Sequence, residues 1–440
     1  MLRRSPGHAT LLALIAGALA VTAHAQPTAT AFTDVTVVPM DSSKLLPGHT
    51  VVVTGDRITA VGPSASTRVP DGAVRVDGRG KFLMPGLAEM HGHIPPPTAP
   101  RELVDNVLFL YVANGVTTVR GMQGTPGQLD LREAAKRGDI ISPALYLAGP
   151  QFSGNVNSAE DASARVRQQK AEGWDLLKVQ EGLSPAAYAA MARTAREVGI
   201  RFGGHVPDQV GLLQALEQGQ ETFDHIDGYI EQLDGRARPV DDKALEDLVQ
   251  RTRKAGAWIV PTMVVWETLQ GPVSLESRTS QPELRYMPAT QVDQWTRSLG
   301  SRLKNPQFNA AQAKLHIDNR MRILQALHKG GVGMLLGSDA PQQFNVPGFS
   351  LHREMKRMVD AGMSAYEVVK SGTANVGQYF KSSDAFGTVA KGQRADLILV
   401  DANPLQDVDN IAKRSGVMVR GRWLPGAEID KRLAQIAQVK

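Results

Sequence analysis

Cysteine is absent from the 440 residues of this chain. Disulfide bonds, thiol nucleophiles and thiolate metal ligands are therefore excluded. A chain of this length can bury a sizeable core without cross-links, so the absence does not argue against an oxidising compartment. Any metal site has to use histidine and carboxylate side chains, and the ten histidines hold most of that potential.

Aromatic residues and an excess of one charge are also scarce. Phe, Trp and Tyr make up only 5% of the chain, so a platform for stacking nucleic-acid bases is not expected. Lys and Arg number 49 against 44 Asp and Glu, and no basic run forms a nucleic-acid footprint. We therefore expect a small-molecule or peptide substrate and no nucleic-acid partner. The sequence leaves open whether the chain forms a homo-oligomer.

Long apolar runs are missing except at the N-terminus. There, Arg3 and Arg4 precede an apolar stretch from Ala9 to Thr22, and an Ala-His-Ala sequence ends at Ala25. This pattern predicts that residues 1–25 are a signal peptide cleaved after its last alanine. The alternative is a membrane anchor, for which the apolar stretch is short. The mature protein is then periplasmic or secreted and does not associate with a membrane.

The two ends of the mature chain, residues 26–80 and 384–440, are rich in predicted strands. Alternating segments such as Ala31–Val38 are separated by turn pairs such as Gly55-Asp56. The C-terminal segment has the same character, with an apolar run at Ala395–Val400. We expect one small composite β-sandwich domain built from both termini.

Residues 81–383 alternate short apolar strands with helical stretches. Such alternation indicates a parallel sheet, and eight units in about 300 residues indicate a closed (β/α)8 TIM barrel of the α/β class. The alternative is a doubly wound open sheet, but no Gly-rich dinucleotide loop follows the first strand. The candidate strands are Phe82–His93, Val116–Gly121, Ala144–Leu147, Leu176–Gln180, Phe202–His205, Thr222–Asp227, Trp258–Val264 and Gly333–Asp339.

Two histidines end the first of these strands. His91 and His93 are two positions apart, so on a strand both imidazoles point to the same side. Paired imidazoles suit a metal such as zinc. A His-x-His pair alone is weak evidence for a metal site. It becomes stronger if the ends of the other strands also carry side chains that can bind a metal.

Four later strands end in further polar residues that can bind metals or protons. All project onto the C-terminal face of the barrel, where barrel enzymes place catalysis. The four are Lys178 on the fourth strand, His205 on the fifth, His225 on the sixth and Asp339 on the eighth. By contrast, His316, His328 and His352 stand in helical stretches, and we interpret them as packing or surface residues.

The residues at the strand ends form a set that, in strand order, resembles the amidohydrolase superfamily of metal-dependent hydrolases. The set is His91, His93, Lys178, His205, His225 and Asp339. The resemblance covers essentially the whole mature chain, including Pro85-Gly86 at the entry to the barrel and Gly387–Leu397 at its exit. Within the superfamily, the phrases Gly115–Arg120 and Gly337–Ala340 are most similar to the imidazolonepropionase-related group. That group includes prolidase-like dipeptidases and ochratoxin-type amide hydrolases.

The resemblance implies a cofactor of two divalent metal ions. Zinc suits histidine and carboxylate ligands best, while manganese, cobalt and iron stay open. The implied ligands are His91, His93 and Asp339 for the more buried ion, His205 and His225 for the second, and Lys178 as a bridge. The bridging role requires Lys178 to be N6-carboxylated, because an ammonium group cannot ligate a metal. The alternative is a plain lysine beside a single metal.

The implied activity is hydrolysis of the amide bonds of dipeptides or N-acyl amino acids by a metal-activated hydroxide. Asp339 is the expected proton shuttle, and His205 and His225 hold the ion that polarises the carbonyl. One alternative is an ester, lactone or phosphoester hydrolase on the same scaffold. A non-catalytic metal-binding protein is the other, but no ligand of the set is missing.

Substrate contacts are harder to place. Tyr229 follows His225 by four residues, so we expect it to bind a substrate carboxylate or the developing oxyanion. Arg120 ends the second strand and is expected to pair with a substrate carboxylate, with a structural ion pair as the alternative. The proline-interrupted segment 265–315, which includes Trp266, is expected to form a lid or pocket wall that selects the substrate.

Overall fold

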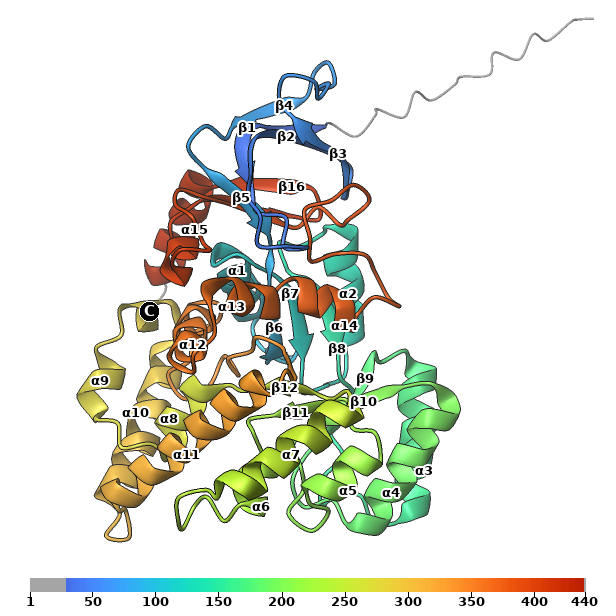
Figure 1. The fold of residues 1–440 in the computed structure, drawn as a ribbon, viewed down its shortest axis with the longest axis vertical. Helices are drawn as coiled ribbons and strands as arrows, with labels where there is room; N and C mark the ends of the chain where they lie inside the picture. The colour runs from blue at the N-terminus through green and yellow to red at the C-terminus, as the bar shows by residue number, and fades with distance from the viewer. Residues whose placement is uncertain (1–28, 439–440) are drawn as a thin grey trace, which may run out of the picture.

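The computed structural model describes residues 29–438, and the predicted signal peptide lies outside them. A β-sheet domain lies at one end of a larger barrel of strands and helices (Figure 1). Both chain ends contribute to the sheet domain, while the middle of the chain forms the barrel (Figure 1). Within the described residues, no helix combines the length and apolar character that a membrane crossing requires.

The terminal sheet has eight strands in the order β16-β15-β14-β5-β1-β2-β3, with β4 paired to β1. Its strands are β1 (Thr30–Val37), β2 (Leu46–Thr54), β3 (Arg57–Pro63), β4 (Val74–Asp77), β5 (Phe82–Pro85), β14 (Leu397–Val400), β15 (Arg414–Val419) and β16 (Arg422–Pro425). The two ends meet where β14 runs antiparallel to β5 and Leu399 faces Leu83. Both leucines belong to a buried core with Phe32, Val51 and Met418. The composite terminal domain is confirmed.

The boundary between the domains differs from the prediction. The expected first barrel strand, Phe82–His93, is two strands: β5 stays in the terminal sheet, and β6 (Leu87–Gly92) enters the barrel. The chain crosses between them at Gly86. A Cβ atom there would come within 2.1 Å of Oγ1 of Thr117, so only glycine permits this close approach.

The barrel is closed and parallel, as predicted. Its strands are β6, β7 (Val116–Gly121), β8 (Ala144–Leu147), β9 (Leu176–Val179), β10 (Arg201–Gly204), β11 (Thr222–Asp224), β12 (Trp258–Val260) and β13 (Gly333–Met334). Two parallel groups, β6–β8 and β9–β13, are joined by a parallel bridge between Ala148 and Leu176. On the other side, the amide of Met90 donates to the carbonyl of Leu336 at 2.9 Å and closes the ring.

Helices surround the barrel (Figure 1). They are α1 (Arg101–Ala113), α2 (Gln128–Arg137), α3 (Ala159–Glu172), α4 (Pro185–Val198), α5 (Leu212–Glu217), α6 (Tyr229–Gln232), α7 (Asp242–Ala255), α11 (Ala310–Lys329), α12 (Phe349–Asp360), α13 (Ala365–Ser371) and α14 (Ala374–Tyr379). The last helix, α15 (Gly426–Gln438), packs against β15 and β16 of the terminal sheet and against α1. Local sequence sets their ends. Ser184 caps α4 by accepting from the amide of Ala187, proline opens the helix, and Gly199 ends it in a left-handed conformation.

The segment 265–315 is largely helical. It contains α8 (Met263–Gln270), α9 (Leu275–Thr279), a 3-10 turn (Pro282–Tyr286) and α10 (Ala289–Lys304). Two of its prolines stand where helices start rather than within them: Pro282 opens the 3-10 turn, and Pro288 is the N-cap of α10. Trp295 and Leu299 on α10 are buried, so the segment packs onto the barrel as an ordered wall.

Candidate metal centre

The structure brings the six predicted metal-binding side chains together at the C-terminal ends of the barrel strands. They are His91 within β6, His93 just after it, Lys178 in β9, His205 after β10, His225 after β11 and Asp339 beyond β13. His225 and Asp339 have φ angles of 66° and 63°. Such left-handed backbone is costly for these residues and is characteristic of functional sites.

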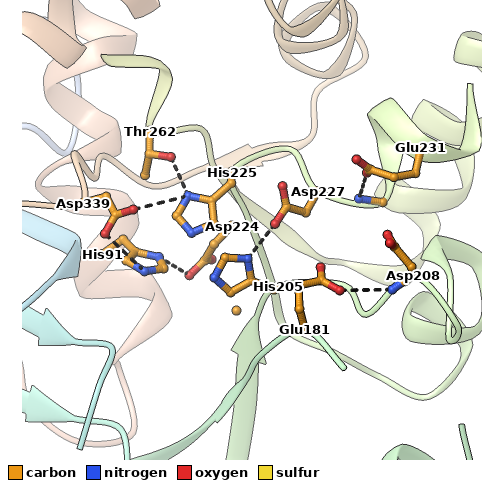
Figure 2. A network of polar contacts seen from close by, with 12 residues as sticks. His91, Glu181, His205, Asp208, Asp224, His225, Asp227, Glu231, Thr262 and Asp339 are labelled. Carbon is orange, nitrogen blue, oxygen red and sulfur yellow. Dashed lines mark hydrogen bonds and ion pairs between the residues drawn. The ribbon is translucent and has the colours of Figure 1, made fainter. Parts of the chain in front are cut away.

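The imidazoles of the cluster lie within contact of one another. Ring centroids are 4.4 Å apart for His91 and His225, and 4.5 Å apart for His205 and His225. Asp339 faces the same point: one of its oxygens is 2.7 Å from Nε2 of His93 and 3.8 Å from Nε2 of His91. Figure 2 shows Asp339, His91 and His225 converging. The strands thus gather nitrogen and oxygen ligands at one place.

The donor chemistry fits a divalent metal. Ligand atoms of His91, His225 and Asp339 all lie within 4.8 Å of one another. Burial, followed by the charge of Lys178, lowers the pKa of His91, and burial likewise lowers that of His225. Both rings are therefore neutral and keep a lone pair for a cation, as metal ligation requires.

Lys178 is buried within this cluster. Its Nζ is 3.2 Å from Nε2 of His91, and only 2% of the residue is exposed. Burial lowers the pKa of the amine to about 8, although nearby carboxylates oppose the shift. Among the described residues Lys178 forms no salt bridge with a carboxylate, although it is buried beside His91. A buried amine without an ion-pair partner is uncommon, so its placement is chemically informative.

The structure shows carboxylates that the sequence analysis missed. Oδ2 of Asp224 accepts from Nδ1 of His91 at 2.7 Å, and Oδ2 of Asp227 accepts from Nδ1 of His205 at 2.6 Å (Figure 2). Such partners orient metal-binding imidazoles and fix which nitrogen carries the proton. Both aspartates flank His225 in sequence, and this Asp-His-Ile-Asp pattern was the signal available.

Two further buried groups hold the cluster in place. Oγ1 of Thr262 is 2.7 Å from Nδ1 of His225. Glu89 accepts from the amides of Ser338 at 2.7 Å and His91 at 3.0 Å, so it joins β6 to the loop after β13. Burial raises the pKa of Glu89 to about 8, and the hydrogen bonds from Ser338 and His91 only partly oppose this shift. These contacts connect the first and last barrel strands beside the ligands.

Tyr229 does not occupy the position that the sequence predicted. It is fully buried, and its hydroxyl lies 2.6 Å from Oγ1 of Thr252. Its ring packs edge-on against Phe223. The side chain turns into the core because α6 begins at this residue, so the predicted substrate contact is corrected to a packing role.

The substrate contact predicted for Arg120 is also corrected. Its guanidinium is fully buried and donates to the carbonyl of Met90, to Oγ1 of Thr222 at 2.9 Å and to Asp224 at 2.8 Å. These bonds leave it facing protein groups rather than a substrate. The structural ion pair, kept open as the alternative, is what the fold contains. Arg120 compensates the buried charge of Asp224 and acts on His91 through it.

A cavity of about 450 Å³ opens beside the cluster. His205 and Asp227 form part of its wall, together with Glu181, Trp266 and Arg236. Trp266 comes from α8, so the segment expected to shape the pocket does contribute to it. Burial raises the pKa of Glu181 to about 7. The ligand atoms of Glu181, His205 and Asp227 form a second group within 4.8 Å of one another.

A closed parallel barrel that gathers buried histidines and an aspartate at its strand ends defines a (β/α)8-barrel protein with a candidate metal site. Residues 82–424 match the model of the amidohydrolase family, and the chain belongs to that family. Adenine deaminase 3 of Rhizobium meliloti (strain 1021) is 22% identical over 408 residues, which are 87% of this chain and 55% of that protein. The chain thus spans about half the length of this curated relative.

Solved structures share the whole architecture. A Xaa-Pro dipeptidase with bound methionine superposes with a TM-score of 0.69 at 19% identity, over 90% of this chain and 100% of that one. The bottromycin amidohydrolase has a TM-score of 0.74 at 23% identity, over 93% and 91% of the two chains. At these identities the likeness establishes the fold.

Proposed function

We propose that the chain is an exported, zinc-dependent amidohydrolase that cleaves the amide bonds of dipeptides or N-acyl amino acids. The observation that carries the proposal is the convergence of His91, His225, Asp339 and Lys178 on one buried point. A dipeptidase and an amidohydrolase among the similar structures support an amide substrate.

Two divalent ions fit the donors present. His91, His93 and Asp339 would hold one ion, and His205 with His225 would hold the other. When bound, the ions supply Lewis acidity that polarises the carbonyl and lowers the pKa of a water molecule. Asp224 and Asp227 hold the imidazoles of His91 and His205 in orientation through the hydrogen bonds described above.

Lys178 would bridge the two ions as a carbamate. Its neutral amine would attack dissolved CO₂: a nitrogen–carbon bond forms, one C=O π bond opens onto oxygen, and the nitrogen loses a proton to solvent. The side chain would then be an anion with two carboxylate oxygens. The lowered pKa of Lys178 supports this chemistry because it increases the fraction of neutral amine near pH 8. A buried ammonium among histidines would only repel the cations.

Asp339 would move the proton during hydrolysis. Its carboxylate reaches His93 at 2.7 Å and lies within 4 Å of two other histidines, so it borders the reacting centre. It takes a proton from the attacking water and delivers one to the leaving nitrogen, which cannot depart as an amide anion. Hydrolysis of an ester depends less on this proton, because an alkoxide is a better leaving group than an amide anion.

Amine release by the zinc-loaded mature protein tests the activity. The panel holds Xaa-Pro, Xaa-Arg and Xaa-hydrophobic dipeptides, N-acyl amino acids, matched esters and lactones, and adenine. Selective cleavage of one amide group supports the proposal and identifies the preferred leaving residue. Turnover of esters or lactones without amides contradicts it, and so does ammonia release from adenine alone.

Export is tested separately on the full-length chain expressed in a bacterium. Removal of residues 1–25 leaves Gln26 as the first residue of the periplasmic or secreted protein. N-terminal sequencing of each cell fraction reads this directly. An uncut chain that stays in the cytoplasm contradicts export and leaves the activity proposal standing.

A further inference from the structure

A second cavity, of about 280 Å³, lies next to the one beside the metal cluster. We call it the arginine cavity; Arg236, Arg302 and His316 line it together with the amides of Gln270, Asn309 and Gln312. No carboxylate is among its lining residues. It is therefore a hollow whose wall carries two arginines and five side-chain amides beside the apolar Phe308 and Ala313. Most of these lining residues belong to the segment 265–315, which is expected to select the substrate.

Arg302 carries a charge that no carboxylate of residues 29–438 compensates. It stands in the last turn of α10, where its Nη2 donates to the carbonyl of Gly271 at 2.8 Å and its guanidinium lies 5.0 Å from the ring centroid of Phe308. No carboxylate of the described residues forms a salt bridge with it, and its Nε is buried without a hydrogen-bond partner. The guanidinium of Arg302 thus has no counter-charge among the described residues, and an anion in the arginine cavity would compensate its charge.

His316 adds a neutral donor on the same wall. Its Nε2 accepts from Nε of Arg320 at 2.8 Å, and arginine can only donate. Burial lowers the pKa of His316 to about 3, so the ring is neutral. The proton must then sit on Nδ1, and that nitrogen can only donate. Arg320 thereby sets the tautomer of a residue that borders the cavity.

The arginine cavity adjoins the catalytic site. Arg236 lines both cavities and forms an ion pair with Glu231 at 2.8 Å. Trp266 stands between them: its ring centroid is 5.9 Å from that of His225 and 6.3 Å from that of His316. The ring centroids of His225 and His316 are therefore at most about 12 Å apart, which is the length of roughly three extended residues. One extended substrate can therefore reach both the metal cluster and the arginine cavity.

We propose that the arginine cavity is a subsite for a substrate carboxylate that is remote from the scissile amide, with Arg302 as the principal contact. The carboxylate is either an acidic side chain or the C-terminus of a peptide longer than two residues. This inference rests on the proposed function and refines it, because it adds peptides with a distal negative charge to the substrate class.

Paired substrates and one variant test the subsite. Each dipeptide ending in Glu is compared with its Gln counterpart, and each tripeptide acid with its C-terminal amide. The natural protein should favour the acidic member in kcat/KM by about tenfold or more, the gain expected from a charge-assisted bond. Arg302→Gln should remove the preference through KM while kcat is kept. Arg297→Gln, at an exposed position of α10, should behave as the natural protein.

The two carboxylate sources give different results. A preference confined to the Glu and Gln pair shows that the arginine cavity binds an acidic side chain. A preference confined to the tripeptide pair shows that it binds the C-terminal carboxylate. Equal rates within both pairs overturn the subsite, as does a preference that survives Arg302→Gln. If neither a peptide nor an N-acyl amino acid is cleaved, the proposed function fails, and calorimetry with glutarate decides the subsite by itself. Binding to the natural protein that weakens about tenfold or more in Arg302→Gln supports it, whereas equal binding overturns it.

Discussion

Asp224 joins a residue of the first barrel strand to one of the second. The same oxygen, Oδ2, accepts from Nδ1 of His91 at 2.7 Å and from Nη2 of Arg120 at 2.8 Å. Burial opposes ionisation, but Arg120 and Lys178 hold the pKa of Asp224 below its usual value. The ionised carboxylate keeps the proton of His91 on Nδ1, so Nε2 of His91 presents its lone pair to the cluster.

Asp224→Asn should weaken metal binding. The amide keeps the size of the side chain but removes the charge that fixes the tautomer of His91, so we expect a loss of about 10- to 100-fold in metal affinity. Titration against a chromophoric chelator measures it. Asp234→Asn, at an exposed position, is the matched control and should leave affinity unchanged. Equal affinity in Asp224→Asn would show that this contact does not tune the ligand.

Lys178→Ala should lose bound metal and most of the activity. The carbamate is the proposed bridge between the ions, and alanine leaves no anion in its place. Metal content by mass spectrometry and kcat report the two effects. Short carboxylic acids such as formate or propionate should restore part of the activity by supplying the missing oxygens. Lys170→Ala on the exposed face of α3 is the control. Full activity and metal content in Lys178→Ala contradict a bridging lysine.

Asp339→Asn should abolish turnover. An asparagine cannot take up the proton of the attacking water, and general acid–base catalysis of this kind contributes about 10² to 10⁴ in rate. The loss should appear in kcat and be larger for an amide than for a matched ester, because the amide depends more strongly on protonation of its leaving group. A variant that retains kcat, with metal content verified, would exclude the shuttle role.

Tyr229→Phe should leave catalysis unchanged and reduce stability. The hydroxyl of Tyr229 binds Thr252 in the core and does not reach the cluster. Removing one buried hydrogen bond should lower the free energy of unfolding by about 1 kcal/mol. Urea unfolding measures this value, and KM on the preferred substrate should not move. A raised KM at unchanged stability would restore the substrate contact that the sequence suggested.

Glu354 should make stability depend on pH. This carboxyl on α12 accepts from the amides of Met263 and Val264 at 2.9 Å, and burial raises its pKa to about 8. The folded protein therefore binds this proton more tightly than the unfolded chain, whose pKa is near 4.5. The contribution of Glu354 to the free energy of unfolding is complete below pH 4.5 and is lost as the pH rises toward 8. The free energy of unfolding should fall more steeply over this interval than in Glu354→Gln; equal slopes would contradict the assignment.

The barrel and its candidate ligands were accessible from the sequence because the signals are local. A buried parallel strand is a short apolar run, and a functional residue follows directly at its C-terminal end, as His225 follows β11. The expectation that Phe82–His93 is one barrel strand was wrong for the same reason, because it too relied on a local signal. Two apolar strands separated only by Gly86 look continuous, and nothing local states that β5 pairs with β14, more than 300 residues away.

The roles of Tyr229 and Arg120 could not be predicted by the same means. Proximity of Tyr229 to a ligand in sequence suggested a place in the site, but α6 turns its side chain inward. Arg120 does stand at a strand end, yet its partner Asp224 lies 104 residues along the chain. A side chain's direction and its partner depend on packing, which a linear pattern does not contain.

The sequence by itself determined the architecture, the order of the strands and the side chains at their ends, because periodicity, turns and polar termini are properties of short segments. Only the tertiary structure decided how those side chains are used. It placed Asp224 on His91 from 133 residues away, turned Tyr229 into the core and left Arg302 without a counter-charge at a cavity. Each of these depends on burial and on contacts between distant segments, which exist only once the chain is folded.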